Sequence, residues 1–377
     1  MKCSTGSDVF DMLGVSRVIN GFGWITAVGG SIMDEEVSEA MSKAADTYLD
    51  LNELNLAAGK FLAQHTDSEA GLVVAGAGAG LLLQAAACIA GQEPDLIERL
   101  PNTQGIPNEV LLYKDHVTNY SGCYRSAGAK VVIWGNGKDS PEDQLRQVIG
   151  KNTVALAYVF HQFNSCPIPL ERAVEIAHEK SIPVVVDAAV MLPPVKNLTE
   201  YINKGADMVT FSGGKGLRGP QSTGILCGRA DLIESARLNM SPYHSVGRAA
   251  KVCKEEIAGV IKALEIFVKT DHESEWEIWK EKSFLIKSIV EDIPALNVVV
   301  EDNDPNRRGP ALVIYFEDDW RGPDSETVLD RLSKRNPSIR IGLGGYENEL
   351  VISPVALKDG EEEEVGRALR EDLLNWD

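Results

Sequence analysis

The chain contains the stretch Thr210-Phe211-Ser212-Gly213-Gly214-Lys215-Gly216-Leu217-Arg218-Gly219-Pro220-Gln221, which places one lysine among glycines just after an apolar run. The run Met208–Phe211 is typical of a buried strand. Because glycines carry no side chain, Lys215 is open to whatever lies at the end of that strand. A lysine that loses its charge easily can form a Schiff base with a carbonyl compound. An ordinary surface-loop lysine is the alternative for this segment taken alone.

A second feature lies upstream, where Ile182-Pro183-Val184-Val185-Val186 leads into Asp187. The spacing of 28 residues (215 − 187) leaves room for one helix and one strand. Ligands of α/β sheets collect at the carboxyl ends of the strands. A carboxylate there can pair with a cationic ring nitrogen and turn a pyridine ring into an electron sink. A helix cap or a loop salt bridge is the alternative for Asp187.

A third feature is the run Val73-Val74-Ala75-Gly76-Ala77-Gly78-Ala79-Gly80, a strand that enters small residues before a helix expected to begin near Leu81. Backbone N–H groups at such a helix start can approach an anion closely. The run does not complete a dinucleotide-binding pattern, and it lacks the Gly-Lys-Ser/Thr of a nucleoside-triphosphate loop. Close packing of the helix on the strand is the alternative reading.

An alternation of short apolar runs and longer amphipathic stretches begins at residue 71. The runs are rich in Val and Ile, which is typical of parallel strands covered by helices on both faces. The sequence therefore predicts an α/β fold with a mostly parallel central sheet. The expected strands are Leu72–Ala75, Val110–Tyr113, Val131–Trp134, Val154–Val159, Ile182–Val186, Met208–Phe211 and Thr223–Leu226, and Leu170–Lys180 is expected to form a helix.

The length of 377 residues predicts two domains, or one large domain with a smaller one. The pattern changes near residue 245, and the charged segment Thr270–Lys282 leads into a region of mixed strands and helices. Asp359 is expected to cap the last helix, whose first turn carries Glu361 to Glu364. We expect an N-terminal segment (1–50) that contributes to the small domain and the active-site mouth, a large domain (51–268) and a small α+β C-terminal domain (269–377).

Charge and cysteine usage restrict the partners. The net charge of −19, from 37 basic and 56 acidic residues, disfavours binding to nucleic acid or to an anionic membrane. The six cysteines form no CxxC pair, and the first residues contain no apolar signal core, so we expect reduced thiols in a cytoplasmic protein. The apolar stretch Gly71–Gly91 imitates a membrane span, but its five glycines favour a buried strand and helix.

Two segments, SGGKGLRGPQSTGILCGR (212–229) and HSVGRAAKVCKEEIAGVIKALE (244–265), resemble the selenocysteine synthase-like branch of the fold type I enzymes that depend on pyridoxal 5′-phosphate (PLP). The stretches INGFGWITAVGGS (19–31) and LVVAGAGAG (72–80) are similar to the same branch. This branch includes seryl-tRNA selenium transferase and D-glucosaminate-6-phosphate ammonia-lyase. The resemblance covers roughly residues 15–270 well and the C-terminal part loosely.

The resemblance implies an aspartate aminotransferase-like fold and PLP as the cofactor. Lys215 matches the Schiff-base lysine, Asp187 the partner of the pyridinium nitrogen, and Gly76-Ala77-Gly78-Ala79 the turn that holds the phosphate. This branch often has a hydroxyl or amide residue in that turn, so further phosphate contacts are needed here, with Ser212 and Arg248 as candidates. The branch works as dimers or larger assemblies with active sites at subunit interfaces, so Arg248 can serve a neighbouring chain.

Further candidates follow from position. His116 comes just after the strand Val110–Tyr113, where fold type I enzymes often place a ring over the cofactor; an ordinary hydrogen-bonded histidine is the alternative. His161 and Gln162 follow the strand Val154–Val159 and can face the ring or the substrate. The remaining candidates are Asn20, Trp24 and Thr26 for the substrate mouth, Tyr243 and His244 for proton transfer, and Arg340 for a substrate carboxylate or as a surface arginine.

We therefore expect a PLP-dependent enzyme that acts at Cα of a small amino acid or amino sugar acid, as a lyase of the β-elimination or ammonia-lyase type. Racemisation, aldol cleavage and transamination share its first steps and stay open. Selenium transfer on seryl-tRNA is disfavoured by the acidic charge and by the start of the family-like sequence near residue 15. A PLP-binding protein without catalysis is the alternative class, although the pair of Lys215 and Asp187 argues for chemistry. A homodimer or higher homo-oligomer is expected.

Overall fold

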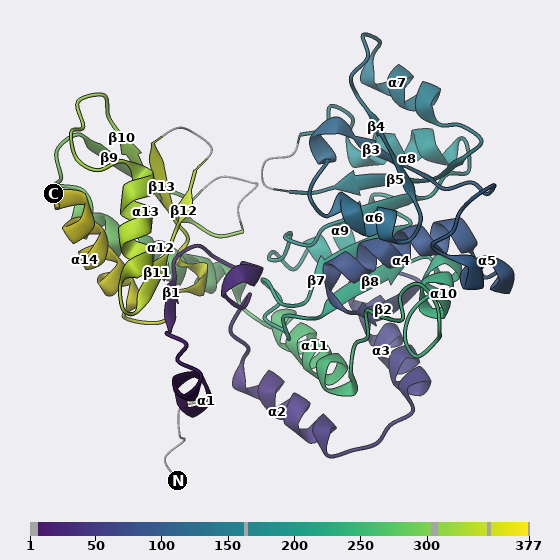
Figure 1. Cartoon of the computed structure of the whole chain (residues 1–377), viewed down its shortest axis with the longest axis horizontal. Helices are drawn as coiled ribbons and strands as arrows, with labels where there is room; N and C mark the ends of the chain where they lie inside the picture. Colours follow the sequence, from purple (N-terminus) through teal and green to yellow (C-terminus); the bar gives the residue numbers. More distant parts are fainter. Residues whose placement is uncertain (1–6, 162–164, 303–307, 345–347, 376–377) are drawn as a thin grey trace. The chain divides into compact units, whose positions relative to one another are not determined.

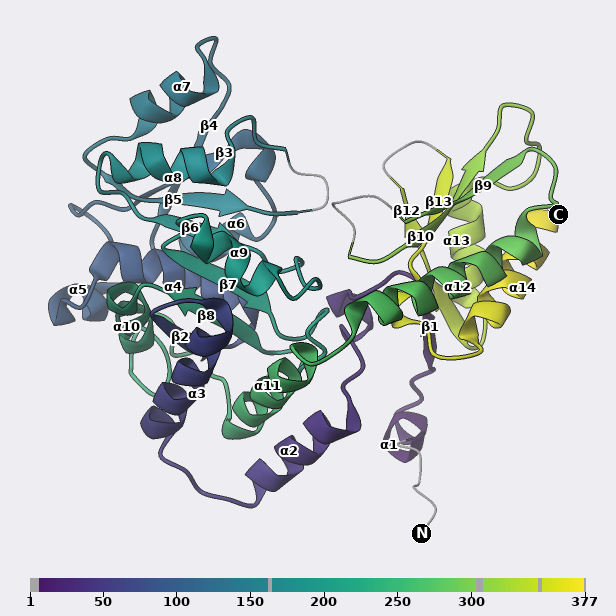
Figure 2. The same ribbon diagram turned by 180° about the vertical axis from the view of Figure 1, so that it is seen from behind.

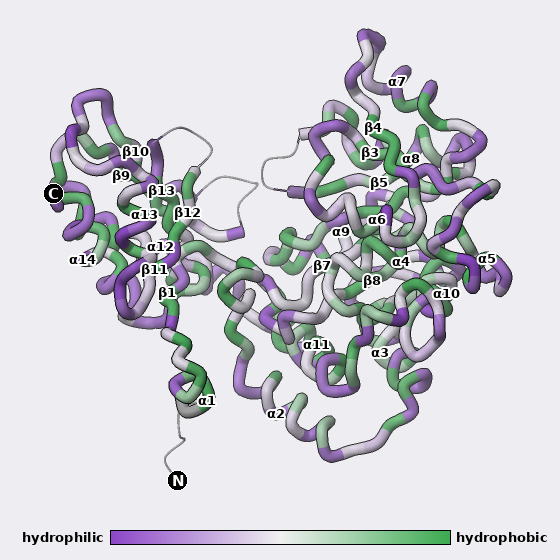
Figure 3. Tube along the Cα trace, viewed as in Figure 1, coloured by the Kyte–Doolittle hydropathy of each residue, from purple (hydrophilic) through white to green (hydrophobic). Residues whose placement is uncertain are grey.

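The computed structural model of the chain describes residues 7–161, 165–302, 308–344 and 348–375 (Figure 1). The chain divides into two compact units, one formed by Ser31–Thr270 and the other by Met1–Gly30 with Asp271–Asp377. Each unit buries a hydrophobic core of its own. In Figure 3 the apolar colouring follows the strands and the inner helices, whereas an outer helix such as α14 (Glu361–Leu374) alternates between polar and apolar residues.

The larger unit is built on a seven-stranded sheet of order β2-β8-β7-β6-β5-β3-β4. Only β8 runs antiparallel to its neighbours, so the sheet is mostly parallel, as the sequence predicts. The central strands are buried on both faces because helices cover the sheet on both sides. The strands are β2 (Ala70–Val74), β3 (Glu109–Tyr113), β4 (Lys130–Trp134), β5 (Thr153–Val159), β6 (Val184–Asp187), β7 (Met208–Ser212) and β8 (Gly224–Gly228).

Helices of the larger unit pack on both faces of this sheet (Figures 1 and 2). One face carries α4 (Gly76–Ala90) with α6 (Ser121–Ser126) and α10 (Ala230–Leu238) beside it. The opposite face carries α3 (Leu51–Thr66), α7 (Pro141–Val148), α8 (Leu170–His178) and α9 (Asn197–Asn203). The remaining helices are α2 (Glu35–Ala45), which packs on α11 (Lys254–Phe267), the short α5 (Pro94–Arg99) and the single turn η2 (Lys114–His116).

Two boundaries differ from the sequence-based expectation. Helix α4 begins at Gly76 and not near Leu81, because the small residues form its first turn instead of a separate loop. The larger unit begins at Ser31, whereas the sequence suggested residue 51, because α2 packs against α11 and joins the core of that unit. The second difference enlarges the unit that carries the lysine segment.

The smaller unit combines a four-stranded antiparallel sheet of order β12-β13-β10-β9 with a parallel pair of β1 and β11. Helices α12, α13 and α14 supply most of the apolar residues that cover these strands. Its elements are α1 (Ser7–Met12), β1 (Val18–Asn20), η1 (Thr26–Val28), α12 (His272–Val290), β9 (Leu296–Glu301), β10 (Ala311–Phe316), α13 (Ser325–Lys334), β11 (Ser338–Arg340), β12 (Gly342–Leu343), β13 (Glu349–Ile352), η3 (Pro354–Ala356) and α14.

The expected cap of the last helix is wrong by one residue. Gly360, with φ of 89°, is the N-cap of α14, and no side chain caps this helix. Asp359 instead accepts a hydrogen bond from Lys282 at 3.0 Å. Glycine suits the cap because only a residue without Cβ adopts this left-handed conformation at little cost. Among the residues that the structure describes, no helix is long and apolar enough to cross a membrane.

Candidate active site

The carboxyl ends of six strands lie at one edge of the large sheet. All strands of this sheet except β8 run in the same direction, so the segments that follow β2, β3, β5, β6 and β7 gather there. Loops at this edge of an α/β sheet are where ligands bind. The sheet thereby gathers most cofactor candidates of the sequence analysis at this edge: Gly76, Ala77, Gly78, Ala79, His116, His161, Asp187, Ser212 and Lys215.

The lysine segment after β7 is a tightly closed turn. The N–H of Arg218 donates to the carbonyl of Lys215 at 2.8 Å, and the N–H of Gly219 donates to that of Gly213 at 2.7 Å. A Cβ added at Gly216 would lie 2.1 Å from the carbonyl oxygen of Leu192, so this glycine is required by packing. Arg218 adopts φ of 56°, a left-handed conformation that a non-glycine residue holds only under constraint. The turn thus fixes the backbone that carries Lys215.

Lys215 is half-buried and forms no hydrogen bond or ion pair with the described residues. Burial lowers the pKa of its ammonium group, and the nearby charge of Asp187 opposes this shift only partly. A lysine in this state releases its proton more easily than one in water, as a nucleophilic amine must. The lysine segment therefore supplies both a constrained backbone and an activated amine.

Asp187 is a buried carboxylate, 7% exposed, at the last position of β6. Its Oδ1 accepts a hydrogen bond from the N–H of Ala189 at 3.0 Å, and its other oxygen has no hydrogen-bond partner among the described residues. Burial raises the pKa of this carboxyl group, while the Ala189 N–H and the charge of Lys215 lower it in part. An ionised carboxylate that accepts one hydrogen bond from the described residues is costly to bury, and a cationic ligand at its free oxygen would lower that cost.

The backbone around Asp187 is held from three directions. Its carbonyl accepts from Phe160 N–H at 2.8 Å, Ala188 N–H donates to Thr210 O at 2.9 Å, and the buried side chain of Gln84 donates to Val186 O at 3.1 Å. These contacts come from β5, β7 and α4, so the carboxylate cannot move far along the sheet edge.

The glycine turn forms the first turn of α4. Its N-cap, Ala75, offers no side-chain acceptor, so no side chain caps the first N–H groups of this helix. Those groups and the helix dipole favour an anion at this position. The glycines have different tasks: Gly76 has φ of +79°, whereas a Cβ at Gly80 would lie 2.2 Å from Thr210 Oγ1. Packing therefore explains Gly80, and the segment from Gly76 to Ala79 remains for a phosphate.

His116 lies in the interior behind β3 and is 2% exposed. Its Nδ1 accepts from the N–H of Val159 at 3.3 Å, and its ring meets those of Tyr113 and Tyr158 edge to face at 5.7 and 4.6 Å between centroids. Burial lowers the pKa of His116 to about 4, so the imidazole is neutral at physiological pH. The aromatic contacts lock the orientation of the ring at the ligand edge.

Fewer contacts define the positions of the other residues expected to bind the cofactor. Burial and the charge of Lys215 lower the pKa of His161, so this ring lies within electrostatic range of the lysine. Ser212 ends β7 and is half-buried. Arg248 lies in the turn after α10, where its Nη1 donates to Ser241 Oγ at 3.5 Å. Gln162 lies outside the described residues.

The structure brings two of the substrate candidates together. Asn20 in β1 and Arg340 in β11 are direct neighbours in a parallel pair, although 320 positions (340 − 20) separate them in sequence. Asn20 also builds its own turn, since its Oδ1 accepts from Phe22 N–H and Gly23 N–H and its Nδ2 donates to Gly23 O. Arg340 is exposed, and no described residue pairs with its guanidinium group.

The remaining candidates for substrate binding and proton transfer lie in different units of the chain. The ring of Trp24 packs edge to face on Trp279 at 6.0 Å, and Thr26 begins the short turn η1, so both belong to the smaller unit. Tyr243 accepts a hydrogen bond from Arg237 at 2.7 Å, and the guanidinium group also lies over its ring. This engagement argues against a free proton-transfer role for Tyr243, and His244 is exposed.

Cys123 is a residue at the ligand edge that the sequence did not single out. It lies on α6, and its Sγ would be 3.4 Å from a Cβ placed on Gly78. Burial and the charge of Asp187 raise the pKa of its thiol, and Arg125 partly opposes this. No pattern around a single cysteine signals such a position, because it depends on the packing of α6 against α4.

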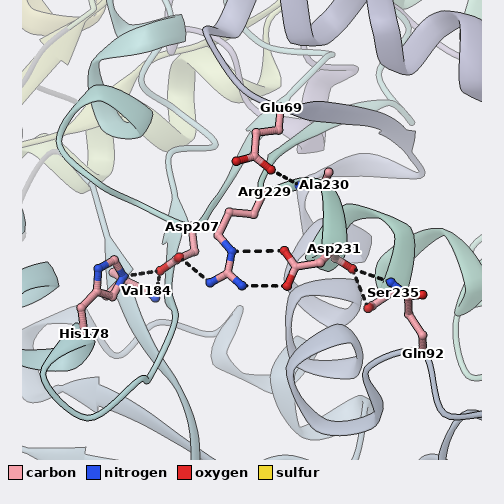
Figure 4. Close-up of polar contacts among 9 residues, drawn as sticks. All are labelled: Glu69, Gln92, His178, Val184, Asp207, Arg229, Ala230, Asp231 and Ser235. Carbon is pink, nitrogen blue, oxygen red and sulfur yellow. Dashed lines mark hydrogen bonds and ion pairs between the residues drawn. The ribbon is translucent and has the colours of Figure 1, made fainter.

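The opposite edge of the sheet holds a second buried aspartate, Asp207, which is 3% exposed (Figure 4). Its carboxylate accepts hydrogen bonds from Val184 N–H at 2.7 Å, His178 Nε2 at 2.8 Å and Arg229 Nη1 at 2.9 Å. Arg229 in turn holds Asp231 with two further bonds, as Figure 4 shows. This network ties together the ends of α8, β6, β7 and β8 and leaves no oxygen of Asp207 for a ligand.

The residues at the ligand edge fit PLP. The uncapped first turn of α4 suits the phosphate, and Lys215 suits the aldehyde carbon. The protonated nitrogen of a pyridine ring would supply the cation that the buried Asp187 lacks. The mostly parallel sheet and this donor set define the chain as a fold type I PLP-dependent enzyme.

Comparison with known proteins identifies the family. Residues 119–278 match the sequence model of L-seryl-tRNA selenium transferase. A 5′-C-glycyluridine monooxygenase-decarboxylase from a Streptomyces species is 31% identical over 386 residues, which cover 98% of this chain and 94% of that protein. The D-glucosaminate-6-phosphate ammonia lyase of Salmonella typhimurium is 27% identical over 81% of this chain and 80% of its own length.

A solved structure of D-glucosaminate-6-phosphate ammonia-lyase superimposes with a TM-score of 0.82 at 23% identity and covers 99% of both chains. This likeness concerns the fold. The relative that is 31% identical over nearly the full length of both chains shows the family: the protein belongs to the selenocysteine synthase-like family of fold type I PLP-dependent enzymes.

Proposed function

We propose that the chain is a PLP-dependent lyase that acts at Cα of a small amino acid or amino sugar acid and removes a substituent from Cβ. The observation that carries this proposal is the pair of Lys215 and Asp187, two groups of opposite charge, one half-buried and one buried, at adjacent strand ends; each feels the charge of the other, and neither forms an ion pair with a described residue. Such groups are costly to bury unless a ligand uses them. When bound, PLP supplies an electron sink for negative charge at Cα.

The residues of the chain divide the work of such a reaction. Lys215 would hold the cofactor, and its lowered pKa suits it to accept the proton from Cα. Asp187 keeps a proton on the ring nitrogen. His116 is 2% exposed and packs against Tyr113 and Tyr158, so we assign its neutral ring a packing role behind the site, where it adds no charge. The first turn of α4 and Ser212 hold the phosphate, and Arg248 supplies positive charge from this chain or from a neighbouring one.

The expected reaction balances without an external oxidant. The Cα proton goes to Lys215, the Cβ–substituent bond breaks with its electrons on the leaving group, and water then releases a keto acid and ammonia. For the substrate side we propose the smaller unit, where Asn20, Trp24, Thr26 and Arg340 lie. The neighbouring side chains of Asn20 and Arg340 offer a cation and an amide for a carboxylate. Gln162 and His161 remain candidates for contacts to the ring or the substrate.

A second candidate reaction is oxidative decarboxylation. It is favoured by the 31% identity to a monooxygenase-decarboxylase over nearly the whole of both chains. Here the bond between Cα and the carboxylate breaks, carbon dioxide leaves, one oxygen atom of dioxygen goes to Cα to give an amide, and the other leaves as water. The same Lys215 and Asp187 serve both reactions, so the fate of the carboxylate decides between them.

Cofactor binding is tested by absorbance. The wild-type chain loaded with PLP is expected to show a band near about 420 nm that disappears on borohydride reduction. The band is expected to be absent in Lys215→Ala and present in Lys180→Ala, a matched control at an exposed lysine outside the site. A loaded wild-type chain without the band contradicts the proposal.

The reaction is tested by product analysis with a panel of D- and L-amino acids and amino sugar acids. Keto acid and ammonia without oxygen uptake support elimination, and carbon dioxide with equal oxygen uptake supports oxidative decarboxylation. Loss of chirality alone, or transfer of the amine to a keto acid, would indicate racemisation or transamination instead. Tight binding of tRNA at moderate salt would overturn the exclusion of nucleic acid, which rests on the net charge of −19.

For the assembly we propose a homodimer or higher homo-oligomer in the cytoplasm. Large apolar side chains are exposed on the larger unit in the link between α2 and α3 and in the first turns of α3, namely Tyr48, Leu49 and Leu56. Clusters of this kind mark surfaces that a partner covers. The five cysteines in the described part of the chain are free, which fits a reducing compartment. Sedimentation is expected to give at least twice the chain mass of 41.0 kDa.

A further inference from the structure

Cys123 lies close to two of the groups that hold the cofactor in the proposed function. Its Sγ faces Gly78, at 3.4 Å from the position of a Cβ on that glycine, and Gly78 belongs to the first turn of α4. The same thiol lies within electrostatic range of Asp187, which is proposed to hold the ring nitrogen. Cys123 is half-buried, and its thiol lies beside both of these groups.

Asp187 independently indicates that this space takes a ligand. The carboxylate is 93% buried (100 − 7), and one of its oxygens has no hydrogen-bond partner among the described residues. A carboxylate in so buried a residue is costly when a single N–H donates to it, and the cost falls when a cation or donor binds at its free oxygen. The space that borders Cys123 thus already contains a group that lacks its partner.

The neutral charge and the polarisability of the Cys123 thiol are compatible with a position beside the cofactor. Burial and Asp187 raise the pKa of Cys123, so its sulfur is a neutral thiol at physiological pH. A neutral sulfur is compatible with an anionic phosphate at the start of α4, whereas a thiolate would repel it. Sulfur is also polarisable and packs well against an aromatic ring.

We propose that Cys123 forms part of the wall of the cofactor site, and that cofactor binding and covalent modification of its thiol exclude one another. This inference rests on the proposed function. It makes Cys123 a modification site that is protected in the loaded enzyme and open in the cofactor-free enzyme. An electrophile or oxidant would then block reloading without touching Lys215.

The test is alkylation of the full chain with iodoacetamide, followed by mass mapping of each cysteine. The sulfur–carbon bond forms, the carbon–iodine bond breaks, iodide leaves and the thiol proton goes to solvent. At a cofactor concentration about 100 times the Kd, mutually exclusive binding slows labelling of Cys123 about 100-fold. Cys253 is the internal control, because it is also half-buried with a raised pKa, of about 11, but lies at the start of α11.

The reciprocal experiment labels the cofactor-free chain first and then adds PLP. The labelled wild type is expected to lose the band near about 420 nm, whereas Cys123→Ser is expected to keep whatever band it showed before treatment. Equal labelling of Cys123 with and without cofactor, or full recovery of the band after labelling, overturns the inference. Both outcomes presuppose the band in the untreated wild type, so failure of the proposed function is recognised separately by its absence there.

Discussion

Two buried aspartates lie at opposite edges of the same sheet, on adjoining strands, and they differ in how their oxygens are satisfied. Asp207, just before β7, accepts hydrogen bonds from a backbone N–H, a histidine and an arginine. Asp187, at the end of β6, accepts one hydrogen bond from a backbone N–H, and its second oxygen has no partner in the described part of the chain. Burial is similar, at 3% and 7% exposure, so burial alone does not distinguish them.

The difference indicates which aspartate is structural and which is held for a ligand. The cost of burying the carboxylate of Asp207 is offset within the chain, so that residue needs nothing further. Burial raises the pKa of Asp187 and lowers that of the neighbouring Lys215, so the charged form of each is only partly stabilised by the described residues. Both groups lie at the edge where parallel sheets bind ligands. A search for function in such a fold therefore begins with buried charges whose donors are missing.

Replacement of Asp187 by asparagine should have the largest effect, and on activity alone. Loss of an electrostatic partner aimed at developing charge lowers kcat by about 10²- to 10³-fold. The free energy of unfolding of the cofactor-free chain should stay the same or rise, because a buried carboxylate with one hydrogen bond is removed. Steady-state kinetics and thermal unfolding measure the two quantities. A strongly destabilised but active variant would reverse the roles assigned to the two aspartates.

Replacement of Asp207 by asparagine should act on stability. The variant loses a charged acceptor shared by three donors, each bond being worth about 1.5–3 kcal/mol. Water replaces part of this because Arg229 and His178 are about half exposed, so we expect a loss of about 3 kcal/mol in the free energy of unfolding. Denaturant unfolding measures it, and Arg237→Gln, which breaks an ion pair outside the network, is the matched control. The absorbance band of the loaded enzyme should persist, and its loss would show that the network also shapes the cofactor site.

The buried histidine behind the ligand edge, His116, extends the comparison to pH. His116, at the ligand edge, has its pKa lowered to about 4 from an ordinary value of 6.5. In the unfolded chain it binds a proton at higher pH than in the folded chain, so stability is complete above about 6.5 and is lost as the pH falls towards about 4. At about 1.4 kcal/mol per pKa unit the loss approaches about 3 kcal/mol.

This prediction is checked by the difference between wild type and His116→Phe in cofactor-free form, measured by denaturant unfolding at several pH values. The difference isolates His116, because the raised pKa of Asp187 has the opposite sign and is common to both chains. A constant difference between pH 4 and 7 would mean that His116 is not held neutral.

The smallest effect is expected at Glu69, which lies just before β2 at the same edge of the sheet as Asp207, called here the structural edge. Its Oε2 accepts the N–H of Ala230, the first residue of α10, at 2.8 Å. Glu69→Ala removes this cap, which is worth about 1 kcal/mol. The free energy of unfolding should fall by that amount with no change in kcat. A change in kcat instead would indicate that the two edges are coupled.

Much of the fold followed from local pattern. The seven apolar runs become the seven strands of the sheet, since Val- and Ile-rich segments of that length are stable when helices bury both faces. The start of α4 at Gly76 was missed because glycines have low helix propensity, and packing against Thr210 overrides that preference. The cap at Asp359 was missed because the left-handed Gly360 takes that position.

The candidate site was foreseeable only in part. Lys215, Asp187 and the turn at Gly76 follow strands and are therefore expected at one edge. Cys123 was not foreseeable, since it reaches Gly78 only through the packing of α6 on α4. The pairing of Asn20 with Arg340 was equally hidden, because strand pairing between distant segments leaves no trace in either segment alone.

The sequence by itself determined the class of fold, the family and the lysine–aspartate pair, because strand periodicity and short glycine-rich segments are local properties of the chain. The tertiary structure alone decided which buried charges remain unsatisfied. Asp187 and Asp207 both lie at one end of a short apolar run. Of the two, only Asp207 accepts hydrogen bonds from side chains of the described residues, namely His178 at the end of α8 and Arg229 just after β8. Hydrogen-bond satisfaction is a non-local property, and at this sheet it separates the structural edge from the edge proposed to bind the cofactor.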